Sequence, residues 1–540
     1  MAAALIMAAS SLAMTGQARS ASELSALDDE TASPASPSSP PQPAPETALN
    51  AAHLDQAIAE IPGRIKAYLA ETGVPGLAIA VVHGGKIVYA QGFGVADKNT
   101  GAKVDADTVF QLASMSKPIG STVISSQVSA GKVSWRSKVT EKLPDFALGD
   151  PAATSMLTIG DLYDHSSGLP DHAGDDLEGL GFDQKTVLDR LRHLPLTPFR
   201  ASYAYTNYGL TAGALATAKA TGTDWATLSR DAIYAPLGMT RTTSSHDEYL
   251  AMPNHAVGHS KVDGTWGVTQ PQYNADDASP AAGVASSAND IAKWMAMLLA
   301  GGKTPDGKQL IDPKVLADSM QTHNVIEPRP EGLTAANSYY GYGFFTGTTP
   351  TGLKFATHAG AFAQGTGTNF EIIPALDLGV VVLTNGFPMG LAETVVLEFL
   401  EIAQHGAVQQ NWWGIYQQGF TAALASAFGS SVDGSPPASP APARSLSDYA
   451  GRYRNDYYGD AVVTADGDTL RLHMGPSSRG TDWTLKHWDG DTFWLLQGTP
   501  DASATTRSAI KFDLNGPTPT LWNEYYHGKS GGKGTLTRVE

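Results

Sequence analysis

The stretch FQLASMSKPIGS, residues 110–121, holds Ser114 and Lys117 three positions apart. Positions i and i+3 share one face of an α-helix, so the Lys117 amine can lie beside the Ser114 hydroxyl. A serine becomes a nucleophile when a base removes its proton, and a lysine is such a base where burial or nearby positive charge lowers its pKa. Pro118 is tolerated only in a helix's first turn, which places Ser114 near a helix N-terminus.

The Ser-x-x-Lys spacing alone is weak evidence, because it recurs along the chain. It is found at three other places: Ser129/Lys132, Ser508/Lys511 and Ser530/Lys533. A solvated serine and lysine are the simpler interpretation there. Ser114 differs because two further patterns follow it, Tyr205-x-Asn207 and then His358-x-Gly360. The ordered combination, and not any single match, predicts a catalytic site.

The composition describes a large acidic protein. Its 540 residues include Lys+Arg 36 and Asp+Glu 53, so the formal net charge is −17, and 42% of residues are hydrophobic. One core rarely grows past about 250–300 residues, so the length predicts two domains. An acidic surface without a Lys/Arg-rich stripe repels phosphate backbones and argues against a nucleic-acid partner. The absence of cysteine excludes disulfides, thiolate metal sites and a cysteine nucleophile.

Composition also predicts the domain boundaries. An apolar run at residues 2–14 is too short to cross a bilayer and suits a signal peptide, so we expect a periplasmic or secreted protein. No Lys or Arg precedes this run, and a disordered N-terminus is the alternative. No later stretch has the roughly 18 apolar residues of a transmembrane span. The predicted parts are a signal peptide at 1–22, a Pro/Ser-rich linker at 23–48, a body at 49–428, a second linker at 429–444 and a C-terminal module at 445–540.

The body has strand patterns near both of its ends and helices between them. Apolar runs flank Gly84-Gly85, and two more flank a turn at Pro374, so each pair predicts a β-hairpin. Helical spacing is found at residues 54–69, 115–130, 207–220, 291–299 and 393–403. This order predicts an α+β fold: one antiparallel sheet, built from both ends of the body, flanked by helices and carrying a helical subdomain.

The C-terminal module has a β-rich pattern. Short strand-like runs are separated by the hairpin dipeptides Asp466-Gly467, Asp489-Gly490 and Asn515-Gly516. Their spacing predicts a small all-β barrel or sandwich. We expect its tryptophans mainly to fill the core, with the lining of a ligand cavity as the alternative: Trp483, Trp488, Trp494 and Trp522.

Six segments of the body resemble, in order, the serine hydrolases of the β-lactamase and penicillin-binding-protein superfamily. They are VPGLAIAVVHGGKIVYAQGFGVAD, FQLASMSKPIGS, LYDHSSGLPDHAGD, YAYTNYGL, SPAAGVASSANDIAKWM and THAGAFAQGTGTNFEIIP. The chain is most similar to the class C β-lactamase-like branch, which includes esterases, D-aminopeptidases and DD-carboxypeptidases. The module beginning LSDYAGRYRNDYYGD resembles the lipocalin-like domain of some members. The resemblance implies a β-lactamase/DD-peptidase-like fold, no metal or cofactor, a small-molecule ester, amide or peptide substrate, and a possible homo-oligomer.

The resemblance also implies a role for each matched residue. Ser114 is implied as the nucleophile that forms an acyl-enzyme. Lys117 and Tyr205 would carry the Ser114 proton to the leaving group and later activate the deacylating water. Asn207 would orient Lys117 and hold the substrate's amide.

One matched position departs from the β-lactamase pattern. His358 stands where β-lactamases usually carry Lys, a permanent cation that clamps a substrate carboxylate, whereas His is mostly neutral near pH 7. Gly360 would let a substrate lie against the strand. The oxyanion hole would be the backbone N–H groups of Ser114 and Ala361. The resemblance therefore favours hydrolysis of esters, or of peptides and amides containing D-amino acids.

Two other functions stay open. One is a DD-carboxypeptidase or β-lactamase acting on cell-wall-like amides, and the other is a catalytically silent ligand-binding sensor. Intact Ser114, Lys117 and Tyr205 argue against silence, although a lone buried tyrosine or strand histidine is usually structural.

The polar loop after residue 164 has a second group of candidate residues. His165 is expected to be structural. Closely spaced acids and a His suggest a metal site, but such side chains are more often solvated, so we predict none there: Asp171, His172, Asp175 and Asp176.

Overall fold

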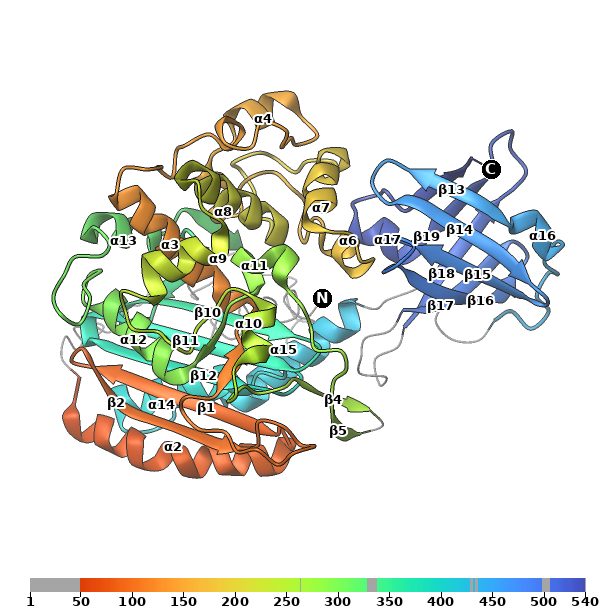
Figure 1. Cartoon of the computed structure of the whole chain (residues 1–540). Coiled ribbons are helices and arrows are strands. Elements are labelled where there is room, and N and C mark those ends of the chain that lie inside the picture. The colour runs from red at the N-terminus through yellow and green to blue at the C-terminus, as the bar shows by residue number, and fades with distance from the viewer. Residues whose placement is uncertain are drawn as a thin grey trace, which may run out of the picture.

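The computed structural model describes residues 49–262, 264–327, 338–427, 431–432, 436–497 and 506–539. These residues form a large body with a smaller β-barrel beside it (Figure 1). The predicted signal peptide and the linker at 23–48 lie outside the described residues, and the linker at 429–444 is described only in part. In the described ranges, no helix is both long enough and apolar enough to cross a membrane.

An eight-stranded sheet runs through the body, and both ends of the body contribute strands. Its order is β2-β1-β12-β11-β10-β9-β8-β7, with antiparallel pairing throughout. The early hairpin pairs directly with the late one, since Leu77 lies opposite Thr384. This confirms the predicted α+β fold. The strands are β1 Gly76–His83, β2 Lys86–Gly94, β7 Asn324–Glu327, β8 Ser338–Tyr340, β9 Phe345–Thr348, β10 Lys354–Phe362, β11 Thr366–Ile373 and β12 Leu378–Thr384.

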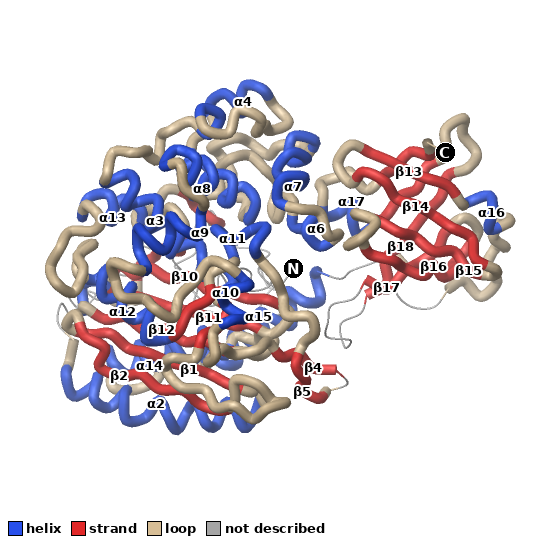
Figure 2. Tube along the Cα trace, in the orientation of Figure 1, coloured by secondary structure: helices blue, strands red, loops and turns tan. Residues whose placement is uncertain are grey.

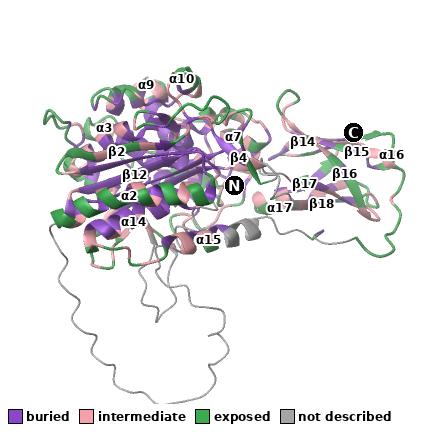
Figure 3. Ribbon diagram, turned by 90° about the horizontal axis from the view of Figure 1, so that it is seen from below, coloured by how far each residue is buried: buried purple, intermediate pink, exposed green. Residues whose placement is uncertain are grey.

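Helices cover both faces of this sheet. Successive residues of a strand point to opposite faces. Leu77 therefore packs in an apolar cluster with α2 (Ala51–Thr72) and α14 (Leu391–His405), whereas its neighbour Ala78 packs in a second cluster with α12 (Ala288–Leu299). The central strands are buried on both sides (Figure 3).

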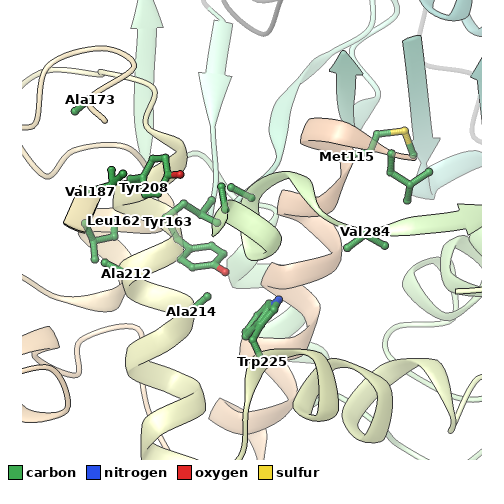
Figure 4. Close-up of a cluster of buried hydrophobic side chains, with 14 of the residues drawn as sticks. Met115, Leu162, Tyr163, Ala173, Val187, Tyr208, Ala212, Ala214, Trp225 and Val284 are labelled. Atoms are coloured by element: carbon green, nitrogen blue, oxygen red, sulfur yellow. The ribbon is translucent and has the colours of Figure 1, made fainter. Parts of the chain in front are cut away.

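A helical subdomain covers the second face, around α3 (Ser116–Ser129) and α8 (Asn207–Thr221). Tyr163 and Trp225 belong to the buried apolar cluster at these helices (Figure 4). α8 ends where Gly222 takes φ 75, the left-handed conformation that glycine adopts easily. The remaining elements are β3 Val109–Gln111, α4 Pro151–Met156, α5 Ile159–Tyr163, α6 Asp175–Gly179, α7 Gln184–Arg190, α9 Trp225–Ser229, α10 His246–Ala251, β4 His259–Val262, β5 Thr265–Val268, α11 Ser279–Ala282, β6 Ala285–Ser287, α13 Pro313–Ser319 and α15 Trp412–Ala427.

The C-terminal module is a closed barrel of eight antiparallel strands, β13 to β20 (Figure 2). This confirms the predicted all-β barrel. Its elements are α16 Leu446–Tyr449, β13 Gly451–Asn455, β14 Gly459–Asp466, β15 Thr469–Met474, β16 Thr481–Asp489, β17 Thr492–Gln497, β18 Thr506–Asp513, β19 Thr520–Asn523, α17 Glu524–Lys529 and β20 Thr535–Arg538.

The expected core position of the tryptophans is wrong for at least two of them. Trp494 lies between the buried Phe493 and Leu495, so strand alternation turns its ring outward. Trp522 follows the buried Leu521 in the same way and is only partly buried. Both rings pack against cationic side chains on the outside of the barrel.

Candidate active site

Ser114 lies in a short helical turn that leads into a long helix. The 3₁₀ turn Ala113–Met115 is followed directly by α3, so the serine stands near the start of the helix. Ala113 adopts φ 49, a left-handed conformation that residues other than glycine rarely take. Such a conformation persists where the surroundings enforce it, and it is common at functional sites.

The side chains of Lys117 and Tyr205 both contact the Ser114 Oγ atom. Lys117 Nζ, one turn along α3, lies 3.2 Å from Oγ. The hydroxyl of Tyr205, just before α8, donates to Oγ at 2.8 Å although 91 positions separate the two residues. Ser114 is 4% exposed and Lys117 0%. The structure thus brings the predicted amine and phenol within hydrogen-bonding distance of the Ser114 hydroxyl in a buried position.

Burial prepares Lys117 to act as a base near neutral pH. Its pKa falls from 10.5 to about 7, chiefly because burial disfavours the charged ammonium, although two acidic side chains of α6 oppose the shift. Nζ donates to Asn207 Oδ1 at 2.6 Å and to the Ala281 carbonyl at 3.0 Å. A neutral amine has only two N–H donors, so these two acceptors use both of them. Its lone pair is then free to accept the Ser114 proton.

Tyr205 is suited to donate a proton and not to accept one. Burial raises the pKa of its phenol well above the usual 10, so the hydroxyl stays protonated. The preceding loop holds its backbone, because Tyr205 N donates to Asp171 Oδ1 at 2.9 Å and Tyr205 O accepts from His172 N at 2.7 Å. These contacts fix where the phenol oxygen reaches Ser114.

Asn207 contacts a carboxylate on its other side. Its Nδ2 lies 3.1 and 2.9 Å from the two oxygens of Asp175, whose Oδ2 is also 2.7 Å from His172 Nδ1. Burial acts to raise the pKa of Asp175, but hydrogen bonds from His172 and Asn207 help to bring it below its usual value. The Asp175 side chain is 17% exposed. The expectation of a solvated acid is therefore wrong for Asp175.

His358 lies behind the site as a neutral ring. It is 0% exposed, and burial first, with the nearby Lys117 charge second, lowers its pKa to about 3. Nδ1 donates to the Ala359 carbonyl at 2.6 Å, which leaves Nε2 to accept from the Tyr340 hydroxyl at 3.0 Å. The position that was expected to contact substrate thus holds an imidazole whose two nitrogens are both engaged within the protein.

Gly360 lies where the sheet supports the turn that carries Ser114. A Cβ atom on Gly360 would lie 2.0 Å from the Leu112 carbonyl and 2.5 Å from Thr368 Oγ1. Thr368 donates to that same carbonyl at 2.8 Å. The packing of the chain itself therefore requires glycine at this position. From the sequence alone, the glycine is explained by the approach of a substrate instead.

Ala361 follows in the part of β10 that lies beyond its pairing with β9. β9 pairs only as far as Thr357, whereas β11 pairs through Phe362. The edge of β10 past Thr357 is consequently not covered by β9. The strand around Ala361 therefore has no β9 partner. A backbone N–H group that is to bind an oxyanion must be free of such a partner.

Sequence reasoning missed the residues that support the site. The Asp171–His172–Asp175 loop borders both Tyr205 and Asn207, and Tyr340 contacts His358. His165 is buried, with its ring 4.7 Å from that of Tyr205. The LYDHSSGLPDHAGD segment marked this loop, but no local pattern shows its contacts with residues after position 200. Among the described residues, no three His, Asp or Glu side chains are placed to hold a metal ion.

Residues 61–399, more than half of the chain, match the family described as Beta-lactamase. The chain belongs to this family. It is a family of serine hydrolases, and the matched segment contains Ser114 and every other predicted site residue. Residues 435–520 of the chain match a second family, a domain of unknown function named DUF3471.

Similar proteins carry several names. An unguisins hydrolase from Aspergillus violaceofuscus (strain CBS 115571) is 26% identical over 78% of this chain and 79% of its own length. Esterase EstB from Burkholderia gladioli is 26% identical over 59% of this chain and 87% of its own. The solved octameric penicillin-binding protein homologue from Pyrococcus abyssi has a TM-score of 0.57 at 19% identity, covering 89% of this chain and 100% of that one. The last likeness shows the fold alone.

Replacing Gly360 by alanine should move Ser114. The added Cβ would meet the Leu112 carbonyl at 2.0 Å, so the turn must shift. We expect acylation of Gly360→Ala by a fluorophosphonate to slow by about tenfold or more, with a loss of about 1–3 kcal/mol in the free energy of unfolding. Gly63→Ala is the control, since no atom lies within 4 Å of its added Cβ in α2. Unchanged acylation in Gly360→Ala would contradict this account.

The rate of Ser114 acylation should rise with pH through the Lys117 titration. The Lys117 amine can accept the serine proton only when it is neutral, and its pKa is about 7. At acid pH the amine is protonated and cannot act as a base. Asp175 and Glu178 raise this pKa, whereas burial lowers it more. We expect the fluorophosphonate reaction to reach half its maximal rate near pH 7. A rate that does not change between about pH 6 and pH 8 would remove Lys117 as the base.

Proposed function

We propose that this protein hydrolyses esters, or amide bonds in peptides containing D-amino acids, through an acyl-enzyme on Ser114. One observation carries the proposal. The Ser114 hydroxyl lies 3.2 Å from a buried amine whose pKa is near 7 and accepts a hydrogen bond from a phenol at 2.8 Å. These are a base and an acid, each in the protonation state that acyl transfer needs at neutral pH.

In the acylation step, Ser114 Oγ forms a bond to the substrate's carbonyl carbon while its proton passes to Lys117 Nζ. The carbonyl electrons move to oxygen, and the backbone N–H groups of Ser114 and Ala361 would stabilise that charge. When the tetrahedral intermediate collapses, the bond to the leaving group breaks. The Tyr205 hydroxyl gives its proton to the departing oxygen or nitrogen and recovers one from the Lys117 ammonium.

In the deacylation step, water replaces the leaving group. Lys117, neutral again, takes a proton from water as the water oxygen attacks the acyl carbon, while the Tyr205 hydroxyl stays protonated. The second intermediate expels Ser114 Oγ, which regains a proton from Lys117. Asn207, through its 2.6 Å contact with Nζ, keeps the amine in place during both steps.

The neutral His358 supports the choice of substrate class. Penicillins and D-Ala-D-Ala peptides present a carboxylate, and a permanent cation suits that group better than a neutral ring. His358 is buried, its pKa is about 3, and both of its nitrogens already have partners. Simple esters and amides without that carboxylate lose nothing from this arrangement.

The similar proteins are consistent with either branch of this proposal. One is named an esterase and another an unguisins hydrolase, whereas the penicillin-binding protein 4 of Amycolatopsis lactamdurans is 29% identical over 46% of this chain. That last name keeps a DD-carboxypeptidase or β-lactamase as the second candidate. Direct comparison of substrates separates the two.

The choice of nucleophile is tested by a matched pair of serine variants. Ser114→Ala should abolish turnover of p-nitrophenyl acetate and labelling by a fluorophosphonate, because it removes the attacking oxygen. Ser129→Ala removes the serine of another Ser-x-x-Lys pair in the same helix, where its hydroxyl donates to the Ser125 carbonyl. It should keep near-normal activity. Equal losses in both variants, or a label found on another serine by mass spectrometry, would refute the assignment.

The substrate class is tested by turnover of p-nitrophenyl acetate, D-Ala-p-nitroanilide and nitrocefin under the same conditions. We expect kcat/KM for the ester or the D-amide to exceed that for nitrocefin by about 10²-fold or more, which corresponds to one lost charged contact. Nitrocefin as the best substrate would favour the β-lactamase alternative. Stoichiometric labelling of Ser114 without turnover of any of the three would indicate a sensor.

A further inference from the structure

The barrel reaches the catalytic body through two adjacent tyrosines. Tyr457 and Tyr458 lie in the connection between β13 and β14, and both are almost fully buried. The Tyr457 hydroxyl donates to Asp176 Oδ1 at 2.7 Å, and the Tyr458 hydroxyl lies 2.5 Å from Asp176 Oδ2 and 2.8 Å from the Tyr526 carbonyl. Both oxygens of one α6 carboxylate are thus bound by the barrel.

Further contacts hold the same part of the body against the barrel. The Tyr457 hydroxyl also accepts from Gly174 N at 3.2 Å, and its carbonyl accepts from Arg190 Nη1 at 3.1 Å. After α6, the backbones approach so closely that a Cβ on Gly181 would lie 2.4 Å from the Arg479 carbonyl. The barrel therefore contacts α6 from before its first residue to beyond its last.

α6 has little stability of its own. It contains five residues, whereas isolated helices of fewer than about 12–15 residues are marginal in water. The residues before it adopt left-handed conformations, with φ 58 at His172 and φ 92 at Gly174. Tertiary contacts must therefore set its position, and the barrel supplies many of them.

The residue next to Asp176 faces the active site. Asp175 accepts from Asn207 Nδ2, so the amide of Asn207 can present only its oxygen to Lys117. If Asp175 moves away, that amide is free to turn, and an NH₂ group would then face the amine. The position of one carboxylate thus decides which end of Asn207 meets the catalytic lysine.

We propose that the C-terminal barrel sets the geometry of the catalytic lysine: Tyr457 and Tyr458 hold α6 through Asp176, α6 places Asp175, and Asp175 orients Asn207 toward Lys117. The four α6 and barrel residues are positioning residues, because none of them touches the reacting atoms. This inference rests on the proposed function in one respect, since it takes Lys117 as the base. It predicts that a conservative change inside the barrel alters catalysis.

The test compares full-length variants that each lose only one or two oxygen atoms or a charge. Tyr457→Phe/Tyr458→Phe removes both barrel hydroxyls, Asp175→Asn removes the last charged contact, and Tyr453→Phe is the control. Tyr453 is also a buried barrel tyrosine, but its hydroxyl donates to the Tyr449 carbonyl at 2.9 Å within the barrel. Asp176→Asn serves in place of the double variant if that variant does not fold, as judged by thermal unfolding.

Two measurements are made on each variant. The first is kcat and KM for p-nitrophenyl acetate. The second is the titration midpoint of Lys117 Nζ by NMR of ¹⁵N-lysine-labelled protein, with the signal assigned through Lys117→Arg. Nζ is faced by Asp175 and Glu178 on α6, by Tyr205 before α8 and by the uncharged His358 and His165. Losing the Asp175 attraction should therefore lower the midpoint.

We expect kcat to fall by about 10–10²-fold in the double variant with KM changed less than about twofold. Its Lys117 midpoint should move in the same direction as in Asp175→Asn, and Tyr453→Phe should match wild type in both measurements. A folded double variant with wild-type kcat and midpoint would overturn the inference and leave the proposed function standing. A wild-type protein without turnover, whose Lys117 midpoint still responds to the barrel variants, would overturn the proposed function and leave the coupling standing.

Discussion

A lysine amine enclosed by protein is the constraint on which the rest of the site depends. A charged ammonium costs several kcal/mol to remove from water, so Lys117 loses its proton near neutral pH instead. The same burial requires acceptors for its two N–H groups, which Asn207 and the Ala281 carbonyl provide. Once those two directions are occupied, the lone pair has one hydrogen-bonding partner left, and that partner is Ser114.

The fold explains how residues distant in sequence satisfy this constraint. β10 and β11 pack against the turn that carries Ser114, and Thr368 of β11 donates a hydrogen bond to the Leu112 carbonyl. The helical layer supplies Lys117 from one helix and Asn207 from the start of another. The backbone strain at Ala113 and His172 lies beside these same groups. Such strained backbone conformations persist because the packing of the surrounding residues does not allow a relaxed conformation at these positions.

Much of the fold was predictable because its signals are local. The Gly84-Gly85 turn, the Pro374 turn and the Gly222 helix end each act within a few residues, and the structure has a β-hairpin or a helix terminus at each. The support of the site was not predictable in this way. Asp175 meets Asn207 32 positions later, and Asp176 meets Tyr457 281 positions later. A polar loop with no local pattern for such contacts resembles a solvated one. No local pattern shows the contact between His358 and the Tyr340 hydroxyl either.

The sheet also determines when this protein becomes a complete enzyme. Leu77 pairs with Thr384, and 384 − 77 gives a sequence separation of 307 residues. At synthesis rates of about 5–20 residues per second, β12 is synthesised roughly 15–60 s after β1, the strand with which it pairs. Closing so long a loop makes this pairing a slow, late event. A nascent chain that already contains Ser114 and Lys117 therefore lacks the platform beneath them, so its reactive amine is assembled only after translation has passed the last strand of the sheet.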